Sequence, residues 1–337
     1  MGNKVALLIP HHFNLYQGII KNLESAGFQV EILVVTDRQF KYKNISQKLK
    51  NFYQKTFLKN KDFKKQLKIQ NHSEDLLDNL EKYHGKLDYA LVIRPDYFSV
   101  ESLQKLKEKT CYTAAYQWDG FERYPEIMEY IEIFDAFFTF DPMNYKNYQY
   151  KYFNLKFTTN FYLDNLKSDP SKEQPETVFF LGSYLPNRTE KVFEIAEFFR
   201  QENIDSNIQI VYPHSSVPSQ LQQANVTVRK NNADYLEMIE EMQKASCLLE
   251  FSNKEIHNGL SFRVFEALHY RKKIITDNPD LRNFDFYDSD NIFVWEGDNL
   301  DGLKTFLKKP YKNLDPKIVE KYGFTSWINN IFNIQPQ

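Results

Sequence analysis

Short apolar runs alternate with amphipathic stretches in the first part of the chain. Residues 5–10 read VALLIP and residues 30–36 read VEILVVT, and polar residues bound each run. Between them, apolar residues recur at helical spacing and Gly27 follows, which predicts a helix over 18–28. A strand, a helix and a second strand in succession form a βαβ unit, the usual start of a parallel sheet.

The alternation is interrupted at residues 38–82 and then resumes. This segment carries ten lysines and a single acid, Asp62, between Lys41 and Lys68, interleaved with aromatic residues. We expect a solvated basic helical face with the aromatic side chains in a core on its other side. The alternative is contact with an anionic membrane. After the segment, strands are expected at 89–95, 111–120, 131–142 and 157–163, and a helix near 99–109.

A second βα series begins after a polar linker at 167–177, KSDPSKEQPET, which contains two prolines. The pattern predicts an α/β protein with two Rossmann-like domains facing across a cleft, in which ligands bind at the carboxyl ends of strands. The strands are expected at 178–184, 207–213, 246–252, 272–278 and 291–297, with helices between them. The domains are expected at 1–166 and 178–318, followed by a helical tail at 319–337 with Trp327 and Ile328 as anchors.

Composition agrees with this picture. The 337 residues are 42% hydrophobic and 26% charged, which is typical of ordered globular domains. A net charge of -2 argues against a general nucleic-acid binder. Cys111 and Cys247 lie in apolar runs far apart, so we expect buried, reduced thiols and a cytoplasmic location. The apolar run at 5–10 is too short for a signal peptide or a membrane span.

The stretch 257–276, HNGLSFRVFEALHYRKKIIT, follows a predicted strand and opens a predicted helix at Gly259. Exposed N–H groups at such a helix start bind phosphate, and Gly259 lets a ligand approach. Ser261 adds a hydroxyl and Arg263 a cation suited to pyrophosphate. Glu266 projects from nearly the same face as Arg263 and could accept hydrogen bonds from ribose hydroxyls. The alternative is that Ser261 caps the helix and Arg263 pairs with Glu266 at the surface.

A second phosphate candidate is FFLGSYLPNR at 179–188. Here a predicted strand ends at Gly182 and Ser183, and Arg188 lies near the start of the next helix. One such loop is weak support for a binding site, because most Gly-Ser loops are simple turns. Two loops of this kind in one domain, each with an arginine, support an anion site more strongly together.

These motifs resemble the nucleotide-sugar-dependent glycosyltransferases of the GT-B type. The likeness is to the group 1 transferases of bacterial lipopolysaccharide and capsule assembly, including the CgeB-like branch. It rests on VFFLGSYLPNR, on NGLSFRVFEAL followed by RKKIIT, and on the segments 10–30 and 116–142 of the first domain. The resemblance implies sugar transfer from a nucleotide-diphosphate sugar to a surface glycan, with an oligosaccharide or a lipid-linked molecule as acceptor. A lipid-linked acceptor would be found at the inner face of the membrane, so the alternative of membrane contact by the basic segment would make this cytoplasmic protein peripheral there.

The same resemblance assigns roles in the second domain. Glu266 would bind the ribose, and the helix start at 258–263 (Asn258, Gly259, Leu260, Ser261 and Arg263) would hold the diphosphate, aided by Arg188 and the Gly182-Ser183 loop. Asn258 departs from the family, because many retaining members have a glutamate there. Glu255 and His257 lie nearby. The sugar contact and the choice between retention and inversion therefore stay open.

An inverting mechanism needs a base in the first domain. Asp119, in QWDG after a predicted strand, is the best placed. The alternative is that it caps a helix, as an aspartate after a strand often does. Asp96, in RPDY, and His12, beside His11, are the other candidates. The helix dipole and two arginines would stabilise the leaving group, so we expect no metal and no cofactor besides the donor substrate.

Two other functions remain open. One is a non-catalytic nucleotide- or sugar-binding protein on the same fold, for which Asn258 is mild support. The other is an NAD-linked oxidoreductase, which would need a G-x-G-x-x-G turn after the first strand. The sequence PHHFNLYQG at 10–18 does not provide that turn.

Overall fold

The computed structural model describes residues 2–37, 40, 42–223, 225–251, 257–297 and 299–335. Its contacts divide the chain into two units. The first consists of Met1–His12, Tyr16–Thr159 and Ile328–Gln337, and the second of Phe13–Leu15 and Asn160–Trp327. Residues 160–166 are thus grouped with the second unit, and the end of the tail with the first, which differs from the division expected from sequence.

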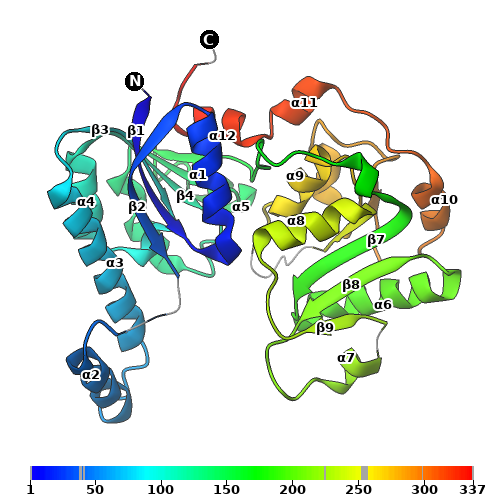
Figure 1. The fold of residues 1–337 in the computed structure, drawn as a ribbon, viewed down its shortest axis with the longest axis horizontal. Coiled ribbons are helices and arrows are strands. Elements are labelled where there is room, and N and C mark those ends of the chain that lie inside the picture. Colours follow the sequence, from blue (N-terminus) through cyan, green and yellow to red (C-terminus); the bar gives the residue numbers. More distant parts are fainter. Residues whose placement is uncertain are drawn as a thin grey trace. The chain divides into compact units, whose positions relative to one another are not determined.

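A six-stranded sheet forms the centre of the first unit, in the order β2-β1-β3-β4-β5-β6, with every neighbouring pair parallel (Figure 1). Its strands are β1 Asn3–Pro10, β2 Phe28–Thr36, β3 Leu87–Ile93, β4 Thr110–Gln117, β5 Ala136–Thr139 and β6 Leu155–Phe157. Its helices are α1 Leu15–Ser25, α2 Ile45–Thr56, α3 Phe63–Lys82, α4 Val100–Glu108 and α5 Pro142–Tyr148.

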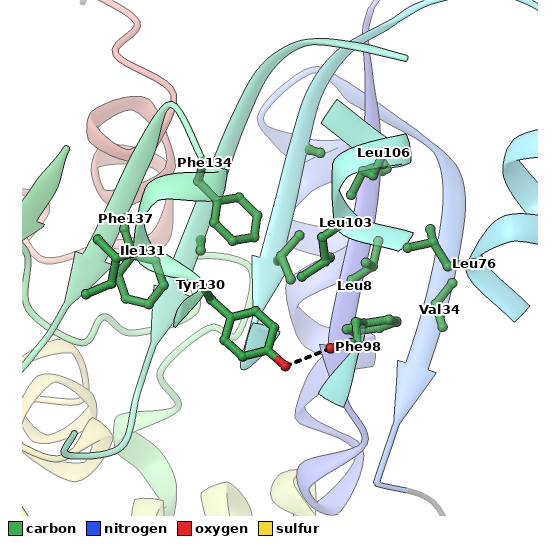
Figure 2. Packing of buried hydrophobic residues seen from close by; sticks show 14 of the residues in the cluster. Leu8, Val34, Leu76, Phe98, Leu103, Leu106, Tyr130, Ile131, Phe134 and Phe137 are labelled. Atoms are coloured by element: carbon green, nitrogen blue, oxygen red, sulfur yellow. Dashed lines mark hydrogen bonds between the residues drawn. The ribbon is translucent and has the colours of Figure 1, made fainter. Parts of the chain in front are cut away.

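Burial of both sheet faces explains why the strands are almost continuously apolar. Val5 to Ile9 of β1 are fully buried. On one face, Leu8 packs with leucines of α3 and α4, including Leu76 and Leu103 (Figure 2). Tyr130 is buried at the edge of this cluster, and its hydroxyl donates to the Phe98 carbonyl at 3.0 Å. Each large side chain buried in this way contributes roughly 1.5–3 kcal/mol of apolar transfer free energy.

The strand expected at 131–142 is much shorter than predicted. Two 3₁₀ helices, Pro125–Glu129 and Ile131–Ile133, come first, and only Ala136–Thr139 forms β5. Ile127 and Ile131 are buried in these turns and pack in the core cluster. The apolar run therefore reflects burial of a turn as well as a strand, and its periodicity alone does not separate the two.

The segment at 38–82 forms two helices whose aromatic residues behave differently. Helix α3 buries Phe63, as expected for a helix that covers a sheet. Helix α2 buries none of its residues, and Phe52 and Tyr53 are more than half exposed. The expectation that these aromatic residues face a core is therefore correct for α3 and wrong for α2, which packs through polar side chains instead.

A second six-stranded parallel sheet lies in the second unit, in the order β12-β11-β10-β7-β8-β9. Its strands are β7 Gln174–Ser183, β8 Ser206–Val211, β9 Thr227–Arg229, β10 Ala245–Glu250, β11 Lys273–Thr276 and β12 Ile292–Val294. The helices are α6 Pro186–Glu202, α7 Ser219–Gln223, α8 Tyr235–Lys244, α9 Phe262–His269, α10 Leu303–Lys308, α11 Pro316–Glu320 and α12 Phe324–Ile331. The prediction of two Rossmann-like α/β units is confirmed.

Three details of the second unit and the cysteines differ from expectation. Strand β7 begins at Gln174, inside the predicted linker, and the short β9 was not predicted from its polar sequence. Cys247 is buried in β10 as predicted, but Cys111 is exposed because it lies at the start of β4. No helix among the described residues has the length and hydrophobicity needed to cross a membrane.

Candidate functional site

The carboxyl ends of β7 and β10 lie side by side in the second sheet, because the two strands are parallel neighbours. Strand β7 ends at Gly182 and Ser183, and β10 ends at Glu250. The loop after β10 leads into α9, which carries Arg263 in its first turn. This is the edge at which ligands bind in open parallel sheets.

Arg263 joins the two strand ends. Its guanidinium donates to the Leu181 carbonyl at 2.5 Å and to the Leu249 carbonyl at 3.3 Å. It also forms an ion pair with Glu250 at 3.4 Å. Arg263 does not pair with Glu266 at the surface, so the alternative of an ordinary exposed i,i+3 ion pair on α9 is wrong.

Arg188, at the start of α6, brings a second guanidinium to the same place. Its Nη2 donates to the Ser183 carbonyl at 2.5 Å. Arg188 and Arg263 lie 5.7 and 5.3 Å from the centre of the same ring, that of Phe180. Burial, and then the charge of Arg263, lower the pKa of Arg188 from its ordinary value. Two cations held this close form an arrangement suited to a diphosphate.

Gly182 is required by the packing of Arg188. A Cβ at this position would lie 2.8 Å from Cζ of Phe180 and 2.9 Å from Nη2 of Arg188. Any larger residue would therefore displace the guanidinium or the ring beneath it. Gly182 thus permits the close approach of the Arg188 side chain to the backbone.

Glu266 is only 1% exposed and lies inside the second unit. The Tyr235 hydroxyl, from α8, donates to its Oε1 at 2.8 Å. Its Oε2 has no hydrogen-bond partner among the described residues. Burial raises the pKa of Glu266 to about 7. A buried carboxyl with one unused oxygen is costly without a further donor, so it fits a position that receives hydroxyl groups from a ligand.

The helix start differs from the sequence prediction. Helix α9 begins at Phe262 rather than Gly259, and Ser261 occupies the cap position without making a side-chain cap. The Ser261 hydroxyl is instead buried, with no partner among the described residues. The Leu260 carbonyl accepts from Asn160 at 2.8 Å, which fixes the chain just before the helix.

Asn258 and Gly259 lie in a bend before α9, and the Gly259 carbonyl is 3.1 Å from Nδ1 of His257. Glu255, considered beside Asn258 for the sugar contact, lies outside the described residues. The nine predicted residues of this region thus lie at the end of β7, in the first turn of α6, in the segment before α9 and on α9 itself. Tyr235 was missed, because no local pattern connects it with Glu266.

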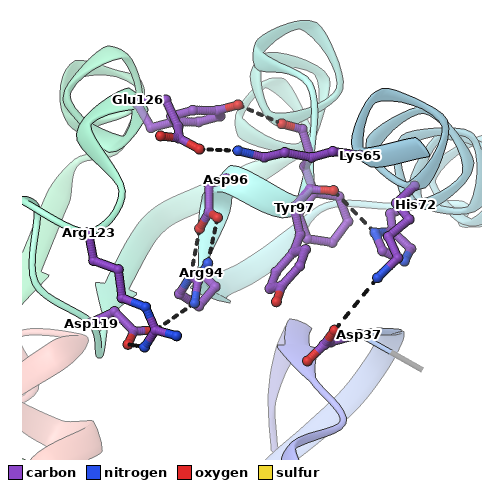
Figure 3. A network of polar contacts seen from close by, with 12 residues as sticks. Asp37, Lys65, His72, Arg94, Asp96, Tyr97, Asp119, Arg123 and Glu126 are labelled. Carbon is purple, nitrogen blue, oxygen red and sulfur yellow. Dashed lines mark hydrogen bonds and ion pairs between the residues drawn. The ribbon is translucent and has the colours of Figure 1, made fainter. Parts of the chain in front are cut away.

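Asp96 and Asp119, two of the three candidate bases, belong to a cluster of charges (Figure 3). Arg94, which is 5% exposed, donates to both oxygens of Asp96 at 2.7 Å. It also donates to Asp119 at 2.5 Å, and Arg123 donates to the other oxygen of Asp119 at 3.1 Å. Burial would lower the pKa of Arg94, but the hydrogen bonds and charge of Asp96, and then Asp119, raise it above its ordinary value.

The sequence predicts only part of this cluster. Asp96 and Asp119 were identified because each follows a strand, whereas Arg94 was not, although it precedes Asp96 in RPDY. Arg94 has a left-handed backbone, with φ of 61°, and its guanidinium lies 3.8 Å from the ring centre of Tyr124. The oxygens of both aspartates are thus already occupied by arginines.

His12 follows β1 in a backbone segment of positive φ that includes Phe13 and Asn14. Three such non-glycine residues in a row are strained, and strain of this kind concentrates at functional sites. The His12 ring lies 5.0 Å from that of Trp118. Burial lowers the pKa of His12 below its ordinary value, and the charge of Asp119 opposes that shift. The lowered pKa favours the neutral form of the His12 ring at pH 7.

Metal ligands are not clustered in the part of the chain that the structure describes. No group of three or more His, Cys, Asp or Glu side chains there is arranged to hold a metal ion. Metal independence itself stays a prediction.

The chain was compared with known protein families, curated proteins and solved structures. No family model and no curated protein matches the chain. Among solved structures, an alpha-glucosyltransferase in complex with UDP and a 13-mer DNA is 12% identical, over 99% of this chain and 100% of its own, with a TM-score of 0.60. A glycosyltransferase from Rickettsia africae ESF-5 is 10% identical, over 98% of both chains, with a TM-score of 0.53.

TarM, known from S. aureus, is 14% identical over 78% of this chain and 58% of its own, with a TM-score of 0.53. These identities are low, so the likeness concerns the fold. The chain has the two-unit GT-B fold of these glycosyltransferases, as the sequence motifs indicated.

Proposed function

We propose that the protein is a glycosyltransferase that uses a nucleotide-diphosphate sugar as its donor. The observation that carries the proposal is the convergence of Arg188, Arg263 and the buried Glu266 at the strand ends of the second unit. Unused polar atoms of three side chains support it, namely Nε of Arg188, Oγ of Ser261 and Oε2 of Glu266, which have no partner among the described residues. The GT-B fold adds a precedent, because the similar alpha-glucosyltransferase is in complex with UDP.

Each group has a separate role in donor binding. Arg188 and Arg263 bind the diphosphate and stabilise the negative charge that develops on it as the sugar leaves. The N–H groups at the start of α9 and the Ser261 hydroxyl add hydrogen bonds to the phosphates. Glu266 accepts from the ribose hydroxyls, while Tyr235 fixes its orientation. Gly182 leaves room for the Arg188 guanidinium, and the Ser183 carbonyl accepts a hydrogen bond from it. Asn258 and Leu260 lie in the loop before the helix.

The acceptor belongs to the same proposal. We place the protein in assembly of a bacterial surface glycan, with an oligosaccharide or lipid-linked acceptor, as the group 1 and CgeB-like resemblance implies. A cytoplasmic location, where nucleotide sugars are made, is part of this proposal. Similar folds act on different acceptors, since the alpha-glucosyltransferase structures contain DNA. Acceptor identity therefore depends on loops of the first unit rather than on the fold.

A donor screen with the full chain tests this function. We expect UDP-, GDP- or dTDP-sugars of one nucleotide class, and not CMP-sugars, to raise the melting temperature, since a ligand at 100 times its Kd adds about 2.7 kcal/mol to the unfolding free energy. Release of the nucleoside diphosphate on addition of acceptor glycans should follow. A response to nicotinamide cofactors alone would overturn the proposal. Binding without any sugar turnover would favour the alternative of a non-catalytic binding protein.

Among the base candidates, His12 is the best suited to an inverting reaction. Asp96 and Asp119 are each paired with arginines, whereas His12 lies in the strained segment after β1 and has a pKa below its ordinary value. We expect His12→Gln to lower transfer kcat roughly 100-fold with donor affinity unchanged. In the native protein, transfer should fall as pH drops below the lowered pKa of His12. An unchanged kcat in the variant would remove His12 as the base, and would leave Asp96, Asp119 or a retaining reaction that needs no base.

A further inference from the structure

Helix α2 of the first unit has its polar side turned toward the protein and its apolar side turned outward. Gln47, Asn51 and Gln54, spaced along one face, are half-buried. Gln47 donates to Asn71 of α3 at 3.1 Å, and Asn51 donates to the Tyr42 hydroxyl at 2.8 Å. The opposite face, which we call the outer face of α2, consists of Ile45, Leu49, Phe52 and Tyr53, between 53% and 77% exposed.

This orientation is the reverse of the one expected for a helix on a globular domain. Figure 1 shows α2 beside the start of α3, away from the strands of its sheet. Phe57 and Leu58, just beyond the helix, extend the apolar surface and are 66% and 57% exposed. Six large apolar side chains gathered on one short segment form a patch of the kind that marks an interaction surface.

Lysines border the outer face on both sides. Lys48 and Lys55 lie one helical turn before and after Phe52, and Lys50 lies one turn before Tyr53. Neither Lys48 nor Lys55 forms an ion pair with a described residue, whereas Lys43 and Lys65 are paired with acids of the first unit. The only acid between residues 41 and 68 is Asp62. A surface that complements these lysines must therefore carry negative charge.

We propose that α2 docks the protein on an anionic lipid surface, with its outer face among the acyl chains and its lysines at the headgroups. An apolar stripe flanked by lysines on a helix parallel to the surface is the arrangement that binds such an interface. A second copy of the chain fits less well, because two outer faces packed together would bring their lysine rims into repulsion. DNA fits less well too, since its phosphates offer no partner to four exposed apolar side chains.

Sedimentation of the full chain with lipid vesicles tests this proposal. We expect binding to vesicles of phosphatidylglycerol and phosphatidylcholine in equal parts, little binding to phosphatidylcholine alone, and release at about 1 M salt. Leu49→Ser with Phe52→Ser should weaken binding at least roughly tenfold, because the apolar contact is lost. Lys48→Gln with Lys55→Gln should weaken it as well, and only on the anionic vesicles.

Controls separate docking from folding and from catalysis. Phe153→Ser removes an aromatic side chain that is 96% exposed elsewhere in the first unit, and should leave vesicle binding unchanged. Because α2 buries no residue, all variants should keep the native melting temperature and UDP affinity, so the result is independent of the proposed function.

Three outcomes would overturn the proposal. The first is the absence of binding to anionic vesicles, or binding that neither double variant changes. The second is self-association of the native chain that the Leu49 and Phe52 changes abolish, which would assign the outer face to a second copy. The third is duplex DNA binding that depends on the lysines alone, with no preference for vesicles.

Discussion

Replacing Arg188 by alanine is expected to weaken UDP binding roughly 10- to 100-fold, the worth of a charge-assisted hydrogen bond, without lowering the melting temperature. The reason lies in what Arg188 contacts. In the protein alone it lies near a second cation, Arg263, and burial lowers its pKa. A base whose pKa is lowered by folding carries its charge at a cost to stability at every pH below that pKa. A bound diphosphate offsets this cost, because its negative charge pairs with both guanidinium groups.

Calorimetry of UDP binding and thermal unfolding of the same variant give the two readouts. Arg200→Ala is the matched control, because Arg200 lies on the same helix, α6, but is exposed and paired with Glu197. The control should change neither UDP affinity nor sugar transfer. Arg188→Lys should fall between the native protein and the alanine variant, since lysine keeps the charge but loses the planar fork. Native UDP affinity in Arg188→Ala would contradict the phosphate site.

The sequence predicts the strands well because a strand buried on both faces leaves a local signal. The apolar run at Val5–Ile9 is one such signal, and it gives β1 directly. The order of strands and the pairing of β7 with β10 have no local signal, because they join segments far apart in the chain. The short β9 was not predicted because its three residues are too few and too polar to give a periodic pattern.

The residues of the candidate site have a local sequence signal, whereas their contacts do not. Residue type and spacing predict Arg188, Arg263 and Glu266 as binding groups, because charged residues near the strand ends of a parallel sheet are unusual for a packed core. Their partners could not be predicted. Tyr235 lies 31 residues from Glu266 in the sequence, and Leu181 lies 82 residues from Arg263. Whether Glu266 is buried or forms a surface pair depends on those distant residues.

Amphipathic pattern has a related ambiguity at α2. The pattern shows that one face is apolar, but it does not say whether that face meets the core or a partner. Periodicity favoured the core. The orientation of α2 instead follows from two polar contacts, those of Gln47 and Asn51, which turn the polar face toward the protein. Hydrogen bonds from a helix's polar face to the rest of the domain have no signature in a single sequence.

Glu266→Gln is expected to stabilise the protein alone above pH 7 and to weaken donor binding there. Burial raises the pKa of Glu266 to about 7, from an ordinary value of 4.5. The folded state thus keeps a proton that the unfolded state has lost, so stability falls as pH rises from the unfolded to the folded pKa. A shift of this size corresponds to a loss on the order of 3 kcal/mol at pH above 7. Glutamine removes that loss and still accepts from Tyr235.

The Glu266→Gln change should raise the stability of the protein alone but lower its affinity for the donor. This pair of opposite effects distinguishes a binding residue from a structural one. If the Glu266 carboxylate accepts from the ribose hydroxyls, UDP stabilises the charged form and releases a proton when it binds near pH 6. Calorimetry in buffers of different ionisation enthalpy measures that proton. The native protein should release it, whereas Glu266→Gln should not, and the variant's UDP affinity should fall roughly 10-fold or more above pH 7. Equal affinity and equal proton release in the two proteins would show that Glu266 is a buried structural acid and that the ribose binds elsewhere.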